Sequence, residues 1–335
     1  MIEFQYYKFD DTQHLKAKDN NISPPGVNMG QNNFSITFWG VRGGYPKPGP
    51  TTVKYGGNTT CFEVRAGKHR IIIDGGTGII ALGAKMMREL AATEVPLRAT
   101  ILVTHTHHDH TQGFPFFVPT RHHANYFDIF GPELLVTREP FEEFLERVMQ
   151  PPVFPIGIEE LYCQRRTERT KHGDTIVLLD AQHPAIRCGV GQPLPELNAE
   201  SVTIKVNHGY NHPKNGVLFF RITYQGRSLV IATDTEGYTG NDQKLIHFSQ
   251  DVDMLVHDAE YDIDEYAKKG IVRQGWGHST WRMAVNVAAA ANAKTLVLTH
   301  HSPGHDDAYL ESMLAKVQTV FPNSCLAREG LTLTI

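Results

Sequence analysis

The stretch that decides the fold is "ILVTHTHHDH", residues 101–110. Its first residues are apolar and β-branched, which is typical of a buried strand. The rest places four histidines and an aspartate within six positions, directly after that strand. A solvated polar loop rarely carries so much imidazole. The pattern therefore indicates a binding site for metal ions at the end of a strand.

The spacing of these residues suits two metal ions rather than one. Alternate residues of an extended segment point the same way, so His105 and His107 can bind one ion together. A turn after them would bring Asp109 and His110 to a second position. Neutral imidazole and carboxylate are zinc ligands, and they also suit manganese. A lone histidine here would more often be a solvated side chain or a core residue.

Further ligand-type residues follow other apolar runs. Asp234 directly follows one such run. A carboxylate in that place can bridge two metal ions, although a single aspartate there would more often be a turn or helix-cap residue. The histidines that follow apolar runs are His208, His212, His300, His301 and His305. We therefore expect several strand ends to meet at one metal site.

Composition and charge are those of a globular protein. The chain has 335 residues, of which 41% are hydrophobic and 20% charged. Its net charge of −4 provides no general attraction to nucleic acid or anionic membranes. No apolar run approaches the ~20 residues that span a bilayer, and the first residues lack the layout of a secretion signal. The four cysteines form no C-x-x-C pair, so we expect a cytoplasmic protein with reduced thiols.

We expect one domain at residues 34–335, after a polar N-terminal extension at residues 1–33 that has little core of its own. Apolar, β-branched runs predict strands at 34–40, 60–66, 70–74, 100–104, 126–131, 175–179, 201–207, 216–224, 228–234, 253–258 and 295–300. Helical periodicity occurs at 78–92, 138–149, 279–293 and 306–321. Such a series predicts two sheets packed together and covered by helices.

Residues 105–110 have the form H-x-H-x-D-H, which resembles the metal-binding motif of the metallo-β-lactamase superfamily. The stretches "DGGTG", "ATDTE", "HDAEY", "GHST" and "LTHHSP" extend the resemblance to the ribonuclease Z branch of phosphodiesterases, over nearly all of 34–302. That branch includes small cyclic-nucleotide phosphodiesterases. The resemblance implies an α/β fold, the αββα sandwich of two mixed β-sheets flanked by helices, and a metal-dependent hydrolase.

The resemblance also implies ligands for two divalent metal ions, with Zn²⁺ expected and Mn²⁺ able to substitute. The matching residues are His105, His107, Asp109, His110, His212, Asp234 and His300. Asp234 matches the aspartate that bridges the two ions. His212 is preferred as the third histidine of the first ion because of its His-Pro step, and His208 is the alternative. His300 is preferred to His301 because the family's last histidine directly follows the strand.

Catalytic positions of the family match Asp109, Glu260 and His278. In the ribonuclease Z branch a glutamate steers a histidine near the scissile phosphate, and the resemblance assigns these roles to Glu260 and His278. Imidazole titrates near neutral pH and can protonate a leaving oxygen. Asp109 would orient a hydroxide bridging the two metals. Arg42 would touch a phosphate or base, although its Gly/Pro-rich surroundings are more often just a turn.

The expected function is hydrolysis of a small phosphodiester, most of all a 3′,5′-cyclic nucleotide. Relatives that process transfer RNA carry a long protruding arm that clasps the RNA. Residues 131–174 instead predict a helix and a short structured connection, and the basic stretch 165–171 is interpreted as a solvated charged face. Structured RNA is therefore a less favoured substrate.

Two other functions fit the same ligands. A thioesterase, lactonase or lactamase would use the metal site without needing Glu260 and His278. A metal-binding sensor would keep the ligands and lack turnover. We expect no membrane partner, and a homodimer is expected only because relatives pair.

Overall fold

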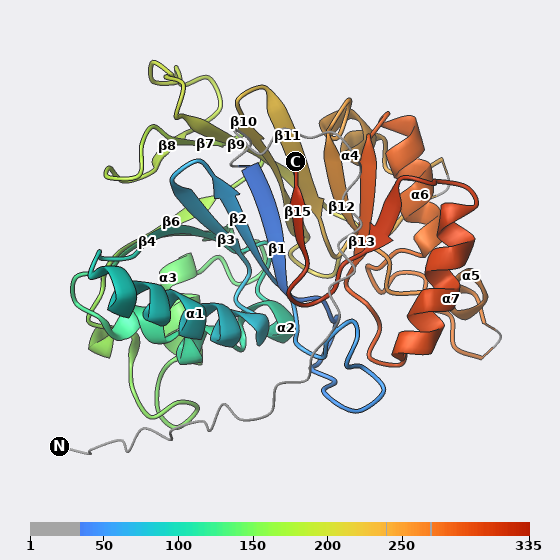
Figure 1. Cartoon of the computed structure of the whole chain (residues 1–335), viewed down its shortest axis with the longest axis horizontal. Coiled ribbons are helices and arrows are strands. Elements are labelled where there is room, and N and C mark those ends of the chain that lie inside the picture. The colour runs from blue at the N-terminus through green and yellow to red at the C-terminus, as the bar shows by residue number, and fades with distance from the viewer. Residues whose placement is uncertain (1–33, 239, 269) are drawn as a thin grey trace. The chain divides into compact units, whose positions relative to one another are not determined.

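The computed structural model describes residues 34–238, 240–268 and 270–335. These residues form two mixed β-sheets that face each other, with helices on the outer side of each sheet (Figure 1). This is the αββα sandwich that the sequence predicts. The expected N-terminal extension, residues 1–33, lies outside the described residues.

The first sheet has seven strands in the order β15-β1-β2-β3-β4-β5-β6. The strands from β15 to β3 pair antiparallel, whereas β3, β4, β5 and β6 run parallel to one another. The bounds are β1 (Phe34–Gly40), β2 (Cys61–Ala66), β3 (His69–Ile73), β4 (Arg98–Leu102), β5 (Tyr126–Pro132), β6 (Gln164–Thr170) and β15 (Thr332–Thr334).

The second sheet has eight strands in the order β14-β13-β12-β11-β10-β9-β7-β8. Here β11 to β14 run parallel, and the remaining pairs are antiparallel. The bounds are β7 (Thr175–Leu178), β8 (Ile186–Cys188), β9 (Val202–Gly209), β10 (Val217–Tyr224), β11 (Arg227–Ala232), β12 (Met254–Asp258), β13 (Thr295–Thr299) and β14 (Ser324–Leu326).

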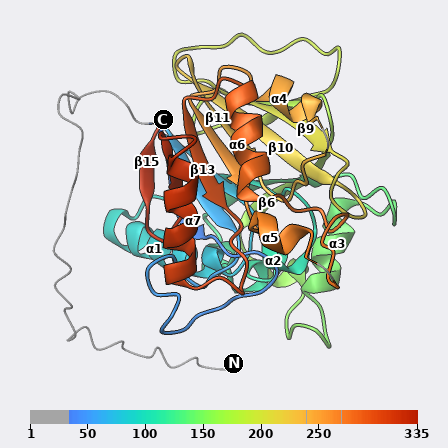
Figure 2. The same cartoon turned by 90° about the vertical axis from the view of Figure 1, so that its right-hand side faces the viewer.

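Helices cover the outer side of each sheet. The first sheet is covered by α1 and α3, and the second by α4, α6 and α7, of which α6 and α7 are seen from outside in Figure 2. The bounds are α1 (Gly78–Thr93), α2 (His108–Thr111), η1 (Phe114–Phe116), η2 (Val118–Arg121), α3 (Phe141–Val148), η3 (Ile158–Glu160), α4 (Gln243–Phe248), α5 (Ile263–Tyr266), α6 (Trp281–Ala290) and α7 (Asp307–Gln318).

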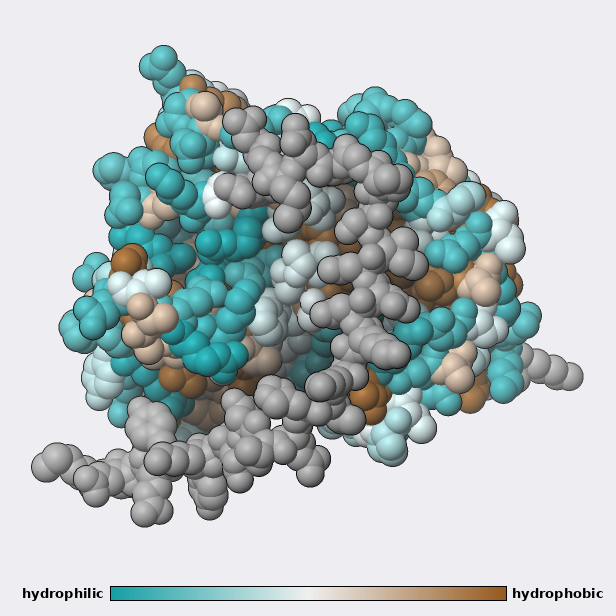
Figure 3. All heavy atoms as spheres, viewed as in Figure 1, coloured by the Kyte–Doolittle hydropathy of each residue, from teal (hydrophilic) through white to brown (hydrophobic). Residues whose placement is uncertain are grey.

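Three apolar clusters hold these layers together. One lies between the sheets and includes Phe38 and Phe220, both fully buried. The other two join each sheet to its helices, as Ile72 with Leu82 does on the first side. Burial of this apolar area is the main force that keeps the layers together. The face seen in Figure 3 is accordingly mostly hydrophilic, with only scattered apolar side chains.

Every strand and helix expected from the sequence is present within a few residues, but further elements were not expected. The strands β8, β14 and β15 have only three residues each, too few to show a period of two. The short helices α4 and α5 also escaped detection. Elements this short form because of their neighbours in space, which a local pattern does not show.

The most informative of the missed elements is β6. Its sequence "QRRTERT" reads as a charged segment, yet it pairs in parallel with β5 at the edge of the first sheet. Charged side chains on an edge strand discourage pairing with another chain. The preceding connection is not a protruding arm, because Phe141, Phe144 and Ile158 pack into the cluster beneath the first sheet.

The parallel strands of both sheets end on the same side of the sandwich as the motif "HTHHDH". Loops at the carboxyl ends of parallel strands commonly carry the functional residues of such folds. Among the described residues, no helix combines the length and apolarity needed to cross a membrane.

Candidate metal centre

Side chains from four strand ends meet in two adjoining clusters. The loop after β4 and the start of α2 provide His105, His107, Asp109 and His110. The loops after β9, β11 and β13 provide the remaining members of the two clusters, which are His212, Asp234 and His300. Both sheets therefore contribute to the site, and each cluster has ligand atoms within 4.8 Å of one another.

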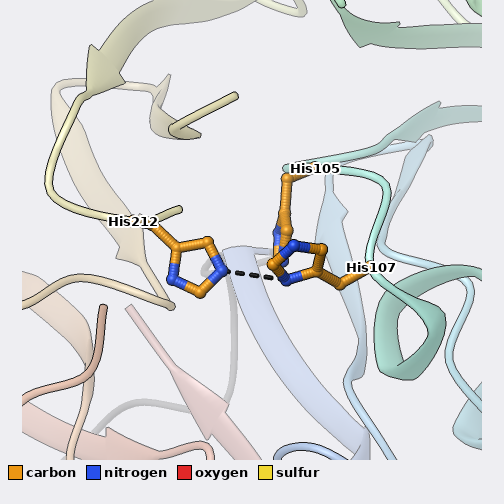
Figure 4. A group of neighbouring side chains, drawn as sticks. All are labelled: His105, His107 and His212. Carbon is orange, nitrogen blue, oxygen red and sulfur yellow. Dashed lines mark hydrogen bonds between the residues drawn. The ribbon is translucent and has the colours of Figure 1, made fainter. Parts of the chain in front are cut away.

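The first cluster consists of His105, His107 and His212, whose rings point toward one another (Figure 4). His212 Nε2 lies 3.0 Å from His107 Nδ1. Burial lowers the pKa of all three imidazoles, to about 4 for His212. They are therefore neutral at pH 7 and present lone pairs, which is the form that binds metals.

The second cluster consists of Asp109, His110, Asp234 and His300. His300 Nε2 lies 3.2 Å from an oxygen of Asp109 and 3.2 Å from an oxygen of Asp234. His110 Nε2 lies 3.1 Å from the other Asp234 oxygen. Burial lowers the pKa of His110 and His300, but the carboxylates, led by Asp234, raise it well above its usual value. Two buried carboxylates thus require positive charge beside them.

Asp234 lies between the two clusters. Its Oδ1 is 3.7 Å from His105 Nε2 and 3.9 Å from His212 Nε2, while its Oδ2 contacts His110. Burial raises the pKa of Asp234, but the histidines, His110 first, outweigh burial and hold it well below its usual range. A carboxylate that is ionised and shared between two groups of imidazoles has the position of a bridging ligand.

Hydrogen-bond acceptors on the far side of the imidazole rings determine which ring nitrogen faces the clusters. His110 Nδ1 donates to Asp74 Oδ2 over 2.8 Å, and His212 Nδ1 donates to the carbonyl of Gly277 over 3.0 Å. Asp74 also accepts from the backbone and hydroxyl of Thr104. A second hydrogen bond of this kind orients a histidine ligand and strengthens its basicity. The "DGGTG" stretch therefore supports the site from behind.

Three of these residues have a left-handed backbone. The φ angles are 62° for Asp74, 54° for Asp234 and 59° for His300. Residues other than glycine rarely adopt this conformation, which costs free energy. Each of the three lies within two residues of a strand end, at the point where the chain turns its side chain toward the clusters. The strained left-handed backbone therefore occurs where these side chains turn toward the clusters.

His278 lies beside the second cluster, and its nearest carboxylate is Asp258. Its Nδ1 is 2.8 Å from Asp258 Oδ2 and 3.4 Å from Glu260 Oε2. Glu260 lies nearer to His300 Nδ1, at 3.1 Å. Burial lowers the pKa of His278, but Asp258 and then Glu260 raise it to about 9. Glu260, the partner that the resemblance assigned to His278, is thus only its second nearest carboxylate. The nearest one, Asp258, was not expected from the sequence.

The alternatives considered from the sequence lie elsewhere. His208 Nε2 contacts the carbonyl of Asn215, and His301 Nε2 contacts that of Ala327. Neither belongs to the clusters of possible ligands found among the described residues. The expectation that Arg42 touches substrate is wrong, because its guanidinium is fully buried and donates to backbone carbonyls, including that of Gly56. Arg42 instead joins two loops beneath the site.

The residues present fit metal ions. His105 Nε2 is buried and has no hydrogen-bond partner among the described residues, although it points at Asp234. A buried nitrogen without a partner is costly unless something else binds it. The histidine-rich first cluster and the mixed second cluster are donor sets typical of zinc and related divalent ions.

The support from Asp74 can be tested with Asp74→Asn. The variant keeps the size of the side chain but loses the charge that holds His110, so metal affinity should fall by about 10–100-fold. Competition with a chromophoric chelator measures it. Asp180→Asn is the matched control, because Asp180 Oδ2 contacts His183 Nδ1 over the same 2.8 Å on the surface. Equal affinities in both variants would contradict the role of Asp74.

Comparison with known proteins gives the same fold and family. The domain family described as the Beta-lactamase superfamily domain matches residues 69–301, more than half of the chain. Ribonuclease Z from Picrophilus torridus is 24% identical over 330 residues, which cover 90% of this chain and 96% of that protein.

Two solved structures share the fold. The metallo-β-lactamase fold protein YhfI from Bacillus subtilis has a TM-score of 0.59 and 17% identity, covering 90% of this chain and 98% of that one. The short form of human tRNase Z has a TM-score of 0.56 and 21% identity, covering 90% of this chain and 99% of that one. The chain therefore belongs to the metallo-β-lactamase superfamily and is similar to its ribonuclease Z members.

Proposed function

We propose that this protein is a di-metal phosphodiesterase that hydrolyses a small phosphodiester, most of all a 3′,5′-cyclic nucleotide, to the monophosphate. The observation that carries the proposal is the arrangement of two ligand clusters with Asp234 between them and with His278, hydrogen-bonded to Asp258, beside them. Its relatives are named ribonucleases, and ribonucleases cleave phosphodiester bonds. The shared chemistry is therefore hydrolysis of a phosphodiester.

We propose a place for each ion from the two ligand sets. One ion would be held by His105, His107 and His212, and the other by Asp109, His110 and His300, with Asp234 shared. Bound there, two divalent ions, zinc most of all, would lower the pKa of a water and neutralise charge on the phosphate. The homodimer and the cytoplasmic location expected from the sequence stay predictions.

His278 is the proposed proton donor to the leaving oxygen. Burial lowers its pKa, but Asp258 and then Glu260 raise it to about 9, which favours the protonated form that a proton donor needs. Asp258 and Glu260 hold the ring and stabilise its charge. Asp109 accepts a hydrogen bond from the backbone N–H of Gly44 over 2.8 Å. That bond fixes the carboxylate of Asp109. We propose that this carboxylate orients the attacking water.

Cleavage of structured RNA is the second candidate, because the relatives are ribonucleases. Three observations favour a small substrate. The connection between β5 and β6 is packed against the sheet rather than extended from it. Within β6, Arg166 pairs with Asp128 and Glu168, so part of the basic stretch is already neutralised. With a net charge of −4, no general attraction for RNA is available.

A thioesterase and a sensor without turnover differ from the proposal at His278. Thioester hydrolysis releases a thiolate, a good leaving group that has little need of a dedicated proton donor. A sensor would need neither the donor nor the carboxylates behind it. The hydrogen bond between His278 and Asp258 therefore favours a reaction whose leaving oxygen requires protonation.

We expect two equivalents of divalent metal per chain and a loss of metal in Asp234→Ala. Removing the shared carboxylate leaves two cations with less compensation, so both metal content and activity should fall. His108→Ala is the matched control, because this exposed residue of the same motif belongs to neither cluster. Elemental analysis and turnover measure both. Equal losses in the two variants would show that the ligand assignment is wrong.

We expect the purified protein to hydrolyse a 3′,5′-cyclic nucleotide, and His278→Ala to lower turnover by about 10²–10⁴-fold while retaining both metals. The loss should be larger for an alkoxide leaving group than for p-nitrophenolate, which departs without a proton. A panel of cyclic nucleotides, precursor transfer RNA and a thioester distinguishes the candidate functions. Efficient cleavage of the RNA or the thioester alone would reject the proposed substrate.

A further inference from the structure

Trp276 is a large aromatic side chain that remains exposed beside the metal centre. The chain has three tryptophans. Trp281 is 4% exposed and donates from its indole to Asp262, as a tryptophan in the core should, whereas Trp276 is 53% exposed. The exposed indole of Trp276 therefore contributes little to the packing of the core.

The position of Trp276 ties it to the reacting groups. The next residue, Gly277, accepts the hydrogen bond from His212 in the first cluster, and the one after that is His278. A substrate phosphate held between the clusters and His278 would carry its remaining groups outward past this loop. Trp276 is thus two residues from the proposed proton donor, on the loop that the organic part of a bound phosphodiester would pass.

A buried carboxylate holds this loop rigid. Glu236 is 2% exposed and accepts hydrogen bonds from the backbone N–H of Gly275 and of Gly277, each within 2.9 Å, and from the hydroxyl of Tyr266. Both glycines have φ near 90°, a conformation that other residues rarely adopt. A Cβ on Gly277 would lie 2.3 Å from His212 Nδ1. The indole is therefore presented on a preorganised loop.

We propose that Trp276 is the platform on which the nucleobase of a nucleoside phosphodiester stacks, and that Glu236 is the positioning residue for this platform. The inference rests on the proposed function and names the residue that recognises the nucleoside at the same site. An aromatic face accepts any base, because every base has a π-face. A platform that is already rigid loses little entropy on binding. The enzyme then prefers diesters that carry a nucleoside.

The test compares two substrates with the same leaving group. Thymidine 5′-(p-nitrophenyl phosphate) and methyl p-nitrophenyl phosphate differ only in the nucleoside, so the ratio of their kcat/KM values with the metal-loaded enzyme reports recognition of the nucleoside. Trp276→Ala should lower this ratio about tenfold, mainly through the KM of the nucleoside ester. Trp276→Phe should retain most of it. An unchanged ratio in Trp276→Ala overturns the proposal.

The control is Tyr162→Ala. Tyr162 is 71% exposed and precedes β6 at the opposite end of the strands, so its loss should leave the ratio unchanged. Glu236→Ala should also lower the ratio, and Glu236→Gln, which keeps one acceptor oxygen, should restore part of it. Equal loss of kcat for both esters in the Glu236 variants would indicate a merely structural role.

Binding supplies a readout that does not depend on turnover. Thymidine 5′-phosphate should quench the tryptophan fluorescence of the parent and not that of Trp276→Phe, because stacking requires contact with the indole. Equal quenching in both proteins overturns the proposal. A parent that hydrolyses neither ester would reject the proposed function, whereas one that hydrolyses both equally well would reject only the platform.

Discussion

The buried carboxylate of Asp234 is the constraint on which the rest of the site depends. Five imidazole nitrogens lie within 4.0 Å of its oxygens, from His105, His110, His212, His278 and His300. At 1% exposure this carboxylate has no access to bulk water, and an unpaired buried charge would cost several kcal/mol. The fold must therefore bring compensating groups to it from both sheets.

The sandwich meets this requirement through its strand ends. His105 and His110 follow β4 of the first sheet, whereas Asp234 and His300 follow β11 and β13 of the second. The apolar cluster between the sheets fixes the distance between these ends. The left-handed backbone at Asp234 and His300 then turns the side chains inward. Apolar packing thus supplies the free energy that a cluster of buried charges cannot supply for itself.

The sequence revealed much of this because its signals are local. Strand patterns indicated the sheets, and the spacing in residues 105–110 together with the family resemblance indicated the residues that the structure groups in two clusters. Asp258 was missed because the resemblance drew attention to Glu260, two residues further along. Only the three-dimensional arrangement shows that Asp258 lies nearer to His278. The strand β6 was missed because its pairing with β5 outweighs its charged composition.

Some contacts around the site cannot be predicted from any short stretch of the sequence. Glu236 contacts Gly275 and Gly277 across about forty residues of chain, so its role depends on long-range distances that no short pattern encodes. Asp74 lies in the stretch "DGGTG", which is part of the family resemblance, but only the structure shows that it accepts the hydrogen bond from His110. Metal ligands must satisfy a fixed chemistry and therefore have a fixed spacing, whereas the loops around them need only reach the substrate. For this reason a ligand motif indicates the metal centre, whereas we propose that residues on the rim, such as Trp276, select the substrate.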